Sequence, residues 1–475
     1  MEIRISVRNL VEFILRSGSI DNRKKAAPDQ AMVEGGRIHR MIQRRMGADY
    51  HAEVTLRYVC NTPEYDLIVE GRADGVIDGE VTTIDEIKGT YRELQRMKEP
   101  VMVHLAQAKC YAFLYANKQE QARMKVRMTY CNIETEELRF FSYEYGREEL
   151  EEWFLGILEE YQKWADYGCK WKEIRTASIR ALPFPYAYRE GQKELATYVY
   201  QSIFHKKKLF IEAPTGVGKT LSTVFPAVKA IGEGKAERIF YLTAKTITRT
   251  VADRTFDLLR ERGMEFKTVV LTAKEKICFL EEAECNPAAC LYANGHYDRI
   301  NDAMYDLLIH ENHYSREKIE EYALKYQVCP FEMSLDMSLY SDGIICDYNY
   351  AFDPHVYLKR FFGEKGATVE PAGGHIFLID EAHNLVERAR EMYSAMLVKE
   401  DFLALKKKVK GYDDRMGLLL ERCSRELLPL KRACEGCRIV EDIEDFVLAV
   451  ERLAERMETY LEDAEDGDVR MQVLE

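Results

Sequence analysis

The stretch Glu212-Ala213-Pro214-Thr215-Gly216-Val217-Gly218-Lys219-Thr220 decides the fold of this chain. Before it, Lys208-Leu209-Phe210-Ile211 predicts a short buried strand, and after it the residues from Leu221 to Ile231 predict a helix. A strand, a glycine-bearing loop ending in Gly-Lys-Thr and a helix are typical of a phosphate-binding loop, in which backbone N–H groups and the helix N-terminus hold phosphate oxygens. The usual first glycine is Ala213 here, which is still small enough for a close backbone approach.

This loop predicts an ATP site that includes Mg²⁺. We expect the loop backbone to hold the phosphates, Lys219 to reach the terminal phosphates and Thr220 to bind Mg²⁺. Upstream, Tyr188 and Gln192 are four residues apart, as a helix start requires, and can sandwich and recognise an adenine. The loop residues expected to contact the nucleotide are Thr215, Gly216, Val217, Gly218, Lys219 and Thr220.

A second motif supports the same chemistry. His375–Ile379 is an apolar run that predicts a strand, and it leads directly into Asp380-Glu381-Ala382-His383. A carboxylate at a strand end can hold Mg²⁺, and the next carboxylate can orient the attacking water. We therefore expect Asp380 to bind Mg²⁺ and Glu381 to orient the water.

The composition bounds the other properties of the chain. A length of 475 residues suggests two to four domains, and a net charge of −13 gives no overall basic footprint for nucleic acid. No apolar stretch is long enough to span a membrane, and the N-terminus has charges within its apolar pattern, unlike a signal peptide. We expect a cytoplasmic protein with no membrane partner, in which the twelve cysteines are metal ligands or free thiols and not disulfides.

The first 165 residues alternate helical and strand-like patterns, which predicts an α/β unit with a mixed sheet. The helical patterns lie near residues 7–15, 35–42, 104–116 and 148–167, and the strand patterns near residues 51–60, 65–77, 81–88, 125–130 and 137–143.

The chemistry of this unit lies on one hairpin, which carries Asp74, Glu86 and Lys88. Glu86 and Lys88 are two apart and share a face of their strand. A two-residue turn would place Asp74 on the other face, whereas a three-residue loop, Asp78-Gly79-Glu80, pairs Asp74 with Ile84 and brings it to the same face. We expect the longer loop. Two carboxylates and a lysine can then bind a divalent cation and activate water for phosphodiester cleavage; solvated strand charges are the alternative.

Further residues join this set: His39 precedes the hairpin, and Gln107 and Tyr111 follow it four apart on one helix face. The whole pattern resembles the RecB-type branch of the PD-(D/E)XK nucleases. The resemblance implies that His39, Asp74 and Glu86 hold Mg²⁺ or Mn²⁺, that Lys88 steers the nucleophile, and that Gln107 and Tyr111 contact substrate. Some members carry an iron–sulfur cluster in this domain, but the clustered C-terminal triplet is absent here, so we interpret four cysteines as core or free thiols: Cys60, Cys110, Cys131 and Cys169.

Four other cysteines lie between the two ATP motifs. Cys278, Cys285 and Cys290 fall within thirteen residues, and Cys329 follows after a polar helical stretch. Such a set suits a tetrahedral metal site or a cubane cluster, with buried structural cysteines as the alternative. Lys245 and Thr246 follow a predicted strand, where they either grip a nucleic-acid backbone or form an ordinary strand-to-helix turn.

These motifs stand in the order seen in XPD-type iron–sulfur helicases of superfamily 2, including DinG, which residues 184–395 resemble. The resemblance implies a 4Fe–4S cluster on the four cysteines, ATP and Mg²⁺ as cofactors, single-stranded or forked DNA as partner, 5′-to-3′ translocation and a role in DNA repair or processing. It also implies a second α/β domain in cis or in trans, because none follows in this chain, which therefore looks truncated.

The expected fold is α/β, with a PD-(D/E)XK-like mixed-sheet domain at residues 1–165 and a linker at 166–183. A RecA-like P-loop domain with a parallel sheet follows at 184–270 and 336–390, interrupted by a cluster insertion at 271–335, and a helical arch-like region fills 391–475. A lone CxxC, Cys434 to Cys437, predicts free thiols more than zinc. Two alternatives to a helicase–nuclease stay open: a metal-dependent nuclease whose ATPase half only regulates or binds DNA, and a non-enzymatic DNA-binding scaffold.

Overall fold

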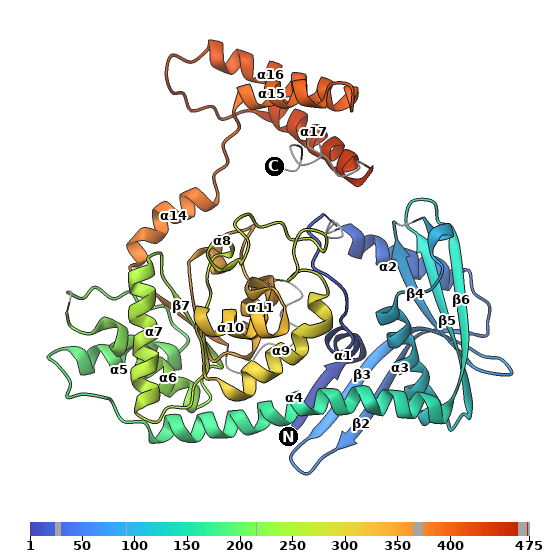
Figure 1. The fold of residues 1–475 in the computed structure, drawn as a ribbon, viewed down its shortest axis with the longest axis horizontal. Helices are drawn as coiled ribbons and strands as arrows, with labels where there is room; N and C mark the ends of the chain where they lie inside the picture. Colours follow the sequence, from blue (N-terminus) through green and yellow to red (C-terminus); the bar gives the residue numbers. More distant parts are fainter. Residues whose placement is uncertain (24–29, 92, 215, 364–373, 464–472, 474–475) are drawn as a thin grey trace. The chain divides into compact units, whose positions relative to one another are not determined.

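The computed structural model of the chain describes residues 1–23, 30–91, 93–214, 216–363, 374–463 and 473. The chain divides into two compact units, Met1–Leu385 and Val386–Glu475 (Figure 1). The larger unit holds two β-sheets with their helices, and the smaller unit is helical. None of the described helices combines the length and apolar character needed to cross a lipid bilayer.

The first sheet has six strands and mixes parallel with antiparallel pairs, as the sequence predicts. Its order is β1–β3–β4–β5–β6, and β2 pairs with β3. The pairs β1–β3 and β4–β5 are parallel, whereas the other neighbours are antiparallel. The strands are β1 (Glu2–Ser6), β2 (Tyr50–Asn61), β3 (Asp66–Ile77), β4 (Thr83–Thr90), β5 (Arg123–Asn132) and β6 (Leu138–Gly146).

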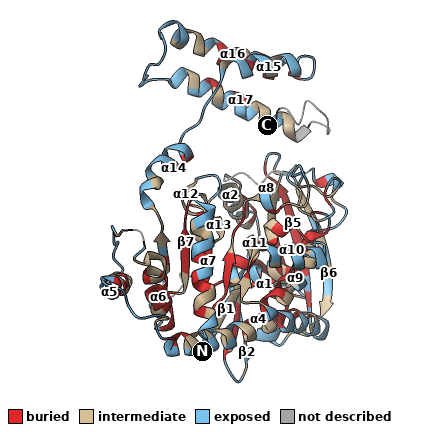
Figure 2. Cartoon of the chain, turned by 60° about the vertical axis from the view of Figure 1, so that its left-hand side comes forward, coloured by how far each residue is buried: buried red, intermediate tan, exposed pale blue. Residues whose placement is uncertain are grey.

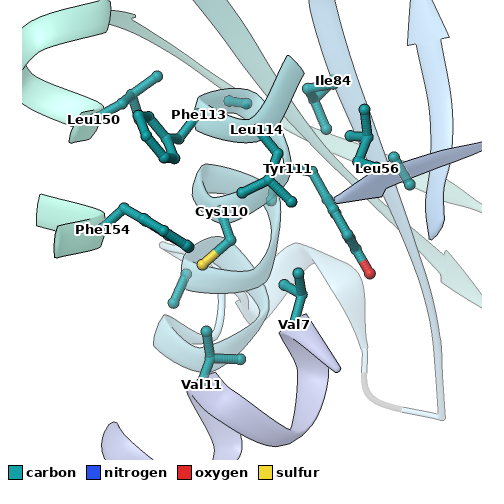
Figure 3. Packing of buried hydrophobic residues seen from close by; sticks show 14 of the residues in the cluster. Val7, Val11, Leu56, Ile84, Cys110, Tyr111, Phe113, Leu114, Leu150 and Phe154 are labelled. Atoms are coloured by element: carbon teal, nitrogen blue, oxygen red, sulfur yellow. The ribbon is translucent and has the colours of Figure 1, made fainter. Parts of the chain in front are cut away.

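Helix α3 (Met102–Gln119) packs between this sheet and helix α4 (Arg147–Ala181). Figure 3 shows Phe113 of α3 pointing toward Phe154 and Leu150 of α4, and the ring centroids of Phe113 and Phe154 lie 4.7 Å apart. Helix α1 (Val7–Ile14) adds Val7 and Val11 to the same core. Full burial of one such side chain stabilises the fold by about 1.5–3 kcal/mol, so this core fixes α3 firmly against the strands.

Helix α4 corrects the expected linker at residues 166–183. The helix runs for 35 residues, through Ala181, and its last turns contact the second sheet's helices. The polar composition of this stretch suggested a linker, but Ile179 and Leu182 are buried in the second core beside Val228. A single helix therefore joins the two halves of the larger unit.

One buried carboxylate ties α4 to the second sheet. The Asp342 side chain accepts hydrogen bonds from the backbone N–H of Lys267 (2.8 Å) and from the indole N–H of Trp171 (3.0 Å), and it pairs with the Arg175 guanidinium. Trp171 and Arg175 belong to α4, so both contacts cross from the helix to the sheet. The three donors satisfy a carboxylate that is only 5% exposed.

The second sheet has five parallel strands in the order β11–β7–β10–β8–β9, as expected for a P-loop domain. The cysteine-bearing insertion supplies β9 and several helices of this half. The strands are β7 (Arg238–Leu242), β8 (Thr268–Val270), β9 (His313–Tyr314), β10 (Gly343–Cys346) and β11 (His375–Ile379). The helices are α5 (Gln192–Phe204), α6 (Lys219–Gly232), α7 (Thr246–Glu261), α8 (Lys274–Ile277), α9 (His296–His310), α10 (Arg316–Tyr326), α11 (Pro330–Met337), α12 (Asn349–Phe352) and α13 (Lys359–Phe362).

The predicted buried strand at residues 208–211 is wrong. These residues are irregular and do not pair with a strand of the described sheet, and the Phe210 side chain is 91% exposed. An apolar run forms a buried strand only if a neighbouring strand pairs with it. The local sequence of the run does not show whether such a partner exists.

The smaller unit is helical, as the apolar spacing predicts. Its core joins Phe402, Met416, Leu420 and Leu453. Figure 2 shows that buried residues gather on strands such as β7 and on α6 in the larger unit, while the helices of the smaller unit are mainly exposed. The helices are α14 (Leu385–Met392, which starts at the boundary), α15 (Lys399–Val409), α16 (Asp414–Arg432) and α17 (Glu444–Asp463).

The junction at Asp342 gives a stability prediction. Asp342→Ala should lower the free energy of unfolding of the larger unit by about 3–5 kcal/mol, because it leaves a buried arginine unpaired and two N–H groups without an acceptor. Denaturant unfolding followed by tryptophan fluorescence measures the loss. Asp302→Ala, at an exposed position of α9, is the matched control and should change the free energy by less than about 0.5 kcal/mol; equal stability of the two variants would contradict the account.

Candidate functional site

The hairpin β3–β4 brings Asp74 and Glu86 to one face, through a longer loop than predicted. Ile77 pairs with Thr83 and Gly75 with Asp85, so five residues, 78–82, connect the strands in place of the expected three. The register is therefore shifted by two positions from the prediction. Because side chains alternate with a period of two, an even shift keeps each residue on its predicted face.

The predicted residues of this site lie together at the hairpin. The Nδ1 atom of His39, on helix α2 (Gln30–Arg44), lies 3.2 Å from Asp74 Oδ1. The backbone N–H of Ile87 donates to Asp74 Oδ2 at 2.8 Å, which ties the carboxylate to the next strand. Lys88 Nζ donates to Glu86 Oε1 at 2.8 Å and to Gln107 Oε1 at 3.1 Å. The structure thus brings together the hairpin residues, the histidine and the glutamine.

Glu86 carries the strongest sign of a cation site. Its side chain is 1% exposed, and its second oxygen, Oε2, is buried without a hydrogen-bond partner. Burial, followed by the charge of Asp74, raises the pKa of Glu86 to about 8, and Lys88 offsets only part of this. A buried carboxylate with a free oxygen beside a second carboxylate is the donor set that a divalent cation requires, so these residues fit a bound metal.

The neighbouring residue, Asp85, shows what a satisfied buried carboxylate looks like. It points to the other face of β4 and is fully buried. It pairs with Arg127 at 2.9 Å and accepts hydrogen bonds from Thr129 (2.5 Å) and Tyr50 (3.2 Å). Asp85 therefore needs no further cation, in contrast to Glu86.

The environment of His39 also suits a metal ligand. Burial disfavours the charged ring, but the hydrogen bond to Asp74 and the charge of Asp74 outweigh burial and raise the pKa of His39. Without a metal, the raised pKa favours the charged ring beside the carboxylate. Since a metal binds the neutral imidazole, metal binding here would release that proton.

Gln107 of helix α3 contacts Lys88, and Tyr111 of the same helix contacts Gln107. Gln107 bonds to the lysine directly, and Tyr111 is 3% exposed, with its hydroxyl against Gly71 of β3. A Cβ atom at Gly71 would lie 2.7 Å from that hydroxyl, so the tyrosine requires glycine there. Their predicted contact with substrate stays a prediction.

Sequence reasoning missed Glu53. One ligand atom each of His39, Glu53 and Asp74 lies within 4.8 Å of the others. Glu53 stands on β2, whose pairing with β3 places Val54 opposite Ala73. A pattern of alternating residues does not give this register, so nothing in the sequence alone connected Glu53 with Asp74.

The phosphate-binding loop leads into α6, as predicted. Gly216 and Gly218 have φ angles of 88° and 78°, a region that favours glycine. Lys219 Nζ donates to the backbone carbonyl of Ala213 at 3.2 Å and lies 3.8 Å from a Glu381 carboxylate oxygen. Thr215 lies outside the described residues, and Val217 is part of the same loop.

Tyr241 links the two expected Mg²⁺ ligands of this site. Its buried hydroxyl interacts with both Thr220 and Asp380, and burial raises the pKa of Asp380. The two ATP motifs therefore meet in space, although 160 residues separate Thr220 from Asp380.

Among the residues expected to contact adenine and DNA, Gln192 is buried beside the phosphate-binding loop, whereas the others are exposed. Gln192 is 5% exposed and packs against Gly218, and its side-chain oxygen accepts from the backbone N–H of Arg189 at 3.0 Å. Tyr188 is 41% exposed and stacks on Phe184, with ring centroids 4.1 Å apart. The last two residues of this set, Lys245 and Thr246, are exposed at the start of α7.

The four cysteines of the insertion line one cavity: Cys278, Cys285, Cys290 and Cys329. None of the twelve cysteines, all of which lie in the described residues, forms a disulfide. Within the described residues no three of their sulfurs lie within 4.8 Å of one another. Four thiol groups around one cavity are a donor set that fits either a tetrahedral metal ion or a cubane cluster.

A segment of the N-terminal region covers this cavity. Residues 16–22 follow α1, and Ile20 lines the cavity itself. The backbone N–H of Ile20 donates to Ala293 O at 3.0 Å, and that of Asn22 donates to Cys285 O at 2.8 Å. Arg16 pairs with Asp336 of α11 at 2.9 Å. The sequence did not predict this contact, because nothing in residues 16–22 indicates a partner almost three hundred positions away.

Comparison with known proteins shows that the central region of the chain is similar to helicases. Residues 245–402 match the DEAD_2 family. A probable ATP-dependent helicase of Methanocaldococcus jannaschii is 36% identical over 109 residues, which are 22% of this chain and 16% of the relative. The human regulator of telomere elongation helicase 1 is 22% identical over 272 residues, 46% of this chain and 21% of the relative.

A third relative is the XPD helicase subunit of the general transcription and DNA repair factor IIH of Dictyostelium discoideum. It is 21% identical over 231 residues, which are 43% of this chain and 29% of the relative. A solved XPD helicase structure is 17% identical and covers 61% of this chain and 50% of its own, with a TM-score of 0.38. The chain thus spans 16% to 29% of the length of these curated relatives. The family match and the relatives support the XPD-type class of superfamily 2 helicases for this region.

The raised pKa of Glu86 gives a pH prediction for the metal-free protein. Because the folded state binds this proton more tightly than the unfolded state, where the pKa is near 4.5, the contribution to stability is present below that pH and is lost as the pH rises toward 8. With a chelator present, Glu86→Gln should therefore gain stability over the unchanged protein between about pH 5 and pH 8, on the order of 1–4 kcal/mol. Denaturant unfolding at several pH values measures this difference; a difference that does not change with pH would show that Glu86 is not a buried, strained charge.

Proposed function

We propose that this chain is part of an ATP-dependent DNA helicase of the XPD type, coupled to a metal-dependent DNA nuclease and acting in DNA repair or processing. The helicase part is supported by the family match and the relatives, together with the meeting of the two ATP motifs at Tyr241. The observation that carries the nuclease part is the convergence of Asp74, Glu86 and Lys88 with His39 on one sheet face.

In the helicase site, Lys219 is the cation for the terminal phosphates, and Thr220 and Asp380 are the groups that would hold Mg²⁺. When bound, Mg²⁺ neutralises charge that develops on the phosphates. Glu381 lies beside Lys219 and would orient the attacking water. We propose that a second helicase domain, in cis or in trans, completes this site, since this class hydrolyses ATP between two domains.

In the nuclease site, His39, Asp74 and Glu86 would hold Mg²⁺ or Mn²⁺, which would polarise the scissile phosphate and lower the pKa of a bound water. Lys88 is held by Glu86 and Gln107, so its ammonium group is fixed next to the carboxylate. From there it can orient the nucleophile and offset negative charge. Tyr111 and Gln107 keep the lysine in place, and a direct contact of either with DNA is part of the same proposal.

The test uses the whole chain and two variants that act on different sites. We expect Mg²⁺- or Mn²⁺-dependent cleavage of single-stranded DNA, and a loss of at least about 100-fold in Asp74→Asn, because the metal supplies several kcal/mol of stabilisation. Lys219→Ala is the matched control: it should abolish binding of a fluorescent ATP analogue and leave cleavage intact, because the two sites share no residue.

Equal cleavage by Asp74→Asn and the unchanged chain would contradict a nuclease at this site. Loss of both activities in Lys219→Ala would contradict the independence of the two sites. DNA-stimulated ATP turnover by the chain with its second domain separates a helicase from a nuclease with a regulatory ATPase half; absence of both ATP turnover and cleavage would favour a DNA-binding scaffold.

We further propose that Cys278, Cys285, Cys290 and Cys329 hold a 4Fe–4S cluster; the cavity that all four residues line supports this proposal. Cys290→Ser should remove most iron and sulfide and the visible absorbance after anaerobic purification, while ATP binding survives. Cys437→Ser, an exposed cysteine of the smaller unit, is the control and should keep the cluster. Stoichiometric zinc without iron would overturn the assignment.

A further inference from the structure

We infer that Glu53 is a further protein ligand of the divalent cation in the N-terminal site, beside His39 and Asp74. This inference rests on the proposed nuclease site and adds a residue that no motif of the sequence indicated. One ligand atom of each of the three side chains lies within 4.8 Å of the others, which is a spacing that one ion can bridge.

The backbone of Glu53 is strained at this position. Its φ angle is 60°, although it stands within β2 and its neighbours keep regular pairing, Ala52 with Gly75 and Val54 with Ala73. A residue other than glycine in this left-handed region costs about 1–3 kcal/mol, and such positions gather at functional sites.

The local contacts of Glu53 do not account for this cost. Its carboxylate pairs with Arg72 at 2.5 Å and accepts from Gln43 Nε2 at 3.1 Å. Arg72 and Glu53 are 66% and 39% exposed, and an exposed ion pair contributes about 0–1 kcal/mol. An ion pair of that size does not by itself offset the strain, and a further function of the carboxylate would explain why a glutamate stands at this position.

Gln43 shows how the carboxylate is held toward the site. The same Nε2 atom donates to Glu53 Oε1 and, at 3.0 Å, to the backbone carbonyl of Asp74. Gln43 lies one turn after His39 on α2, so helix and sheet together fix the two acidic residues and the histidine. This is the support that metal ligands receive from neighbouring side chains.

A second observation points to a cation near Asp74 and His39. Glu86 is 1% exposed, its Oε2 atom has no partner, and it interacts with the charges of Asp74 and His39. The carboxylates of Glu53 and Asp74 and the imidazole of His39 are a donor set for a hard or borderline divalent ion such as Mg²⁺ or Mn²⁺. Among the described residues, Glu86 belongs to no group of three ligand atoms within 4.8 Å of one another, so it lies beside this set and not within it. Mn²⁺ is the practical probe, because its binding is measured directly.

The experiment measures Mn²⁺ binding to the whole chain by electron paramagnetic resonance, with five substitutions. Glu53→Gln should weaken binding by at least about 10-fold, the loss found even for groups one step removed from a metal. Glu53→Gly removes the carboxylate but suits the left-handed backbone, so it should unfold no more readily than the unchanged chain in chelator and still lose affinity. Asp74→Asn is the reference for loss of a ligand.

Arg72→Gln separates a ligand from a salt-bridge partner. If Glu53 serves only to pair with Arg72, this variant should weaken Mn²⁺ binding as much as Glu53→Gln does. If Glu53 is a ligand, Arg72→Gln removes a guanidinium that competes with Mn²⁺ for the Glu53 carboxylate, and Mn²⁺ binding should be unchanged or tighter. Glu70→Gln, on β3 and 3.6 Å from Arg4, removes a comparable strand glutamate outside the site and should have no effect.

The outcomes distinguish this inference from the proposed function. Weaker Mn²⁺ binding in both Glu53 variants, together with intact Mn²⁺ binding in Arg72→Gln, supports Glu53 as a ligand. Loss of binding in Asp74→Asn with full binding in both Glu53 variants overturns the ligand and keeps the nuclease site. No Mn²⁺ binding to the unchanged chain overturns both.

Discussion

The arrangement of the larger unit depends on the contact between helix α4 and the Asp342 carboxylate. The helix starts in the core of the first sheet and ends in the core of the second, and Trp171 and Arg175 anchor it to Asp342 on the way. A flexible linker would let the two halves move apart at little cost. A continuous helix with an ionic contact of low exposure joins the sheet that carries Asp74 and Glu86 to the sheet beside the Gly-Lys-Thr loop, within one compact unit.

The cavity lined by cysteines adds a second connection between the halves. Residues 16–22 lie on it through the backbone bonds of Ile20 and Asn22 and the ion pair of Arg16 with Asp336. The chain before α2 and the insertion therefore share an interface that a change in one would transmit to the other. Residues 16–22 thus connect the end of helix α1 with the cavity lined by cysteines.

The sequence predicted correctly which side chains share a sheet face, because the alternation of side chains along a strand decides this. Asp74, Glu86 and Lys88 were expected on one face, and they lie there because an error of two residues in the loop leaves strand parity unchanged. It failed where partners far along the chain decide. The position of Glu53 opposite β3 follows from the pairing of β2 with β3. Helix α4 continues through the expected linker because Ile179 is buried in the second core. Phe210 is exposed because its segment pairs with no strand of the described sheet. None of these is written in the local pattern of residue types.

The claim that a divalent cation binds beside the unpartnered oxygen of Glu86 is tested most directly by anomalous diffraction from crystals soaked in Mn²⁺. The account predicts a peak within coordination distance of the carboxylates of Asp74 and Glu86 and of the imidazole of His39. A second group in the described residues, Asp253, Asp257 and His313, also has ligand atoms within 4.8 Å of one another and serves as an internal comparison. A peak at that group alone, or no peak beside Glu86 at saturating Mn²⁺, would contradict the account.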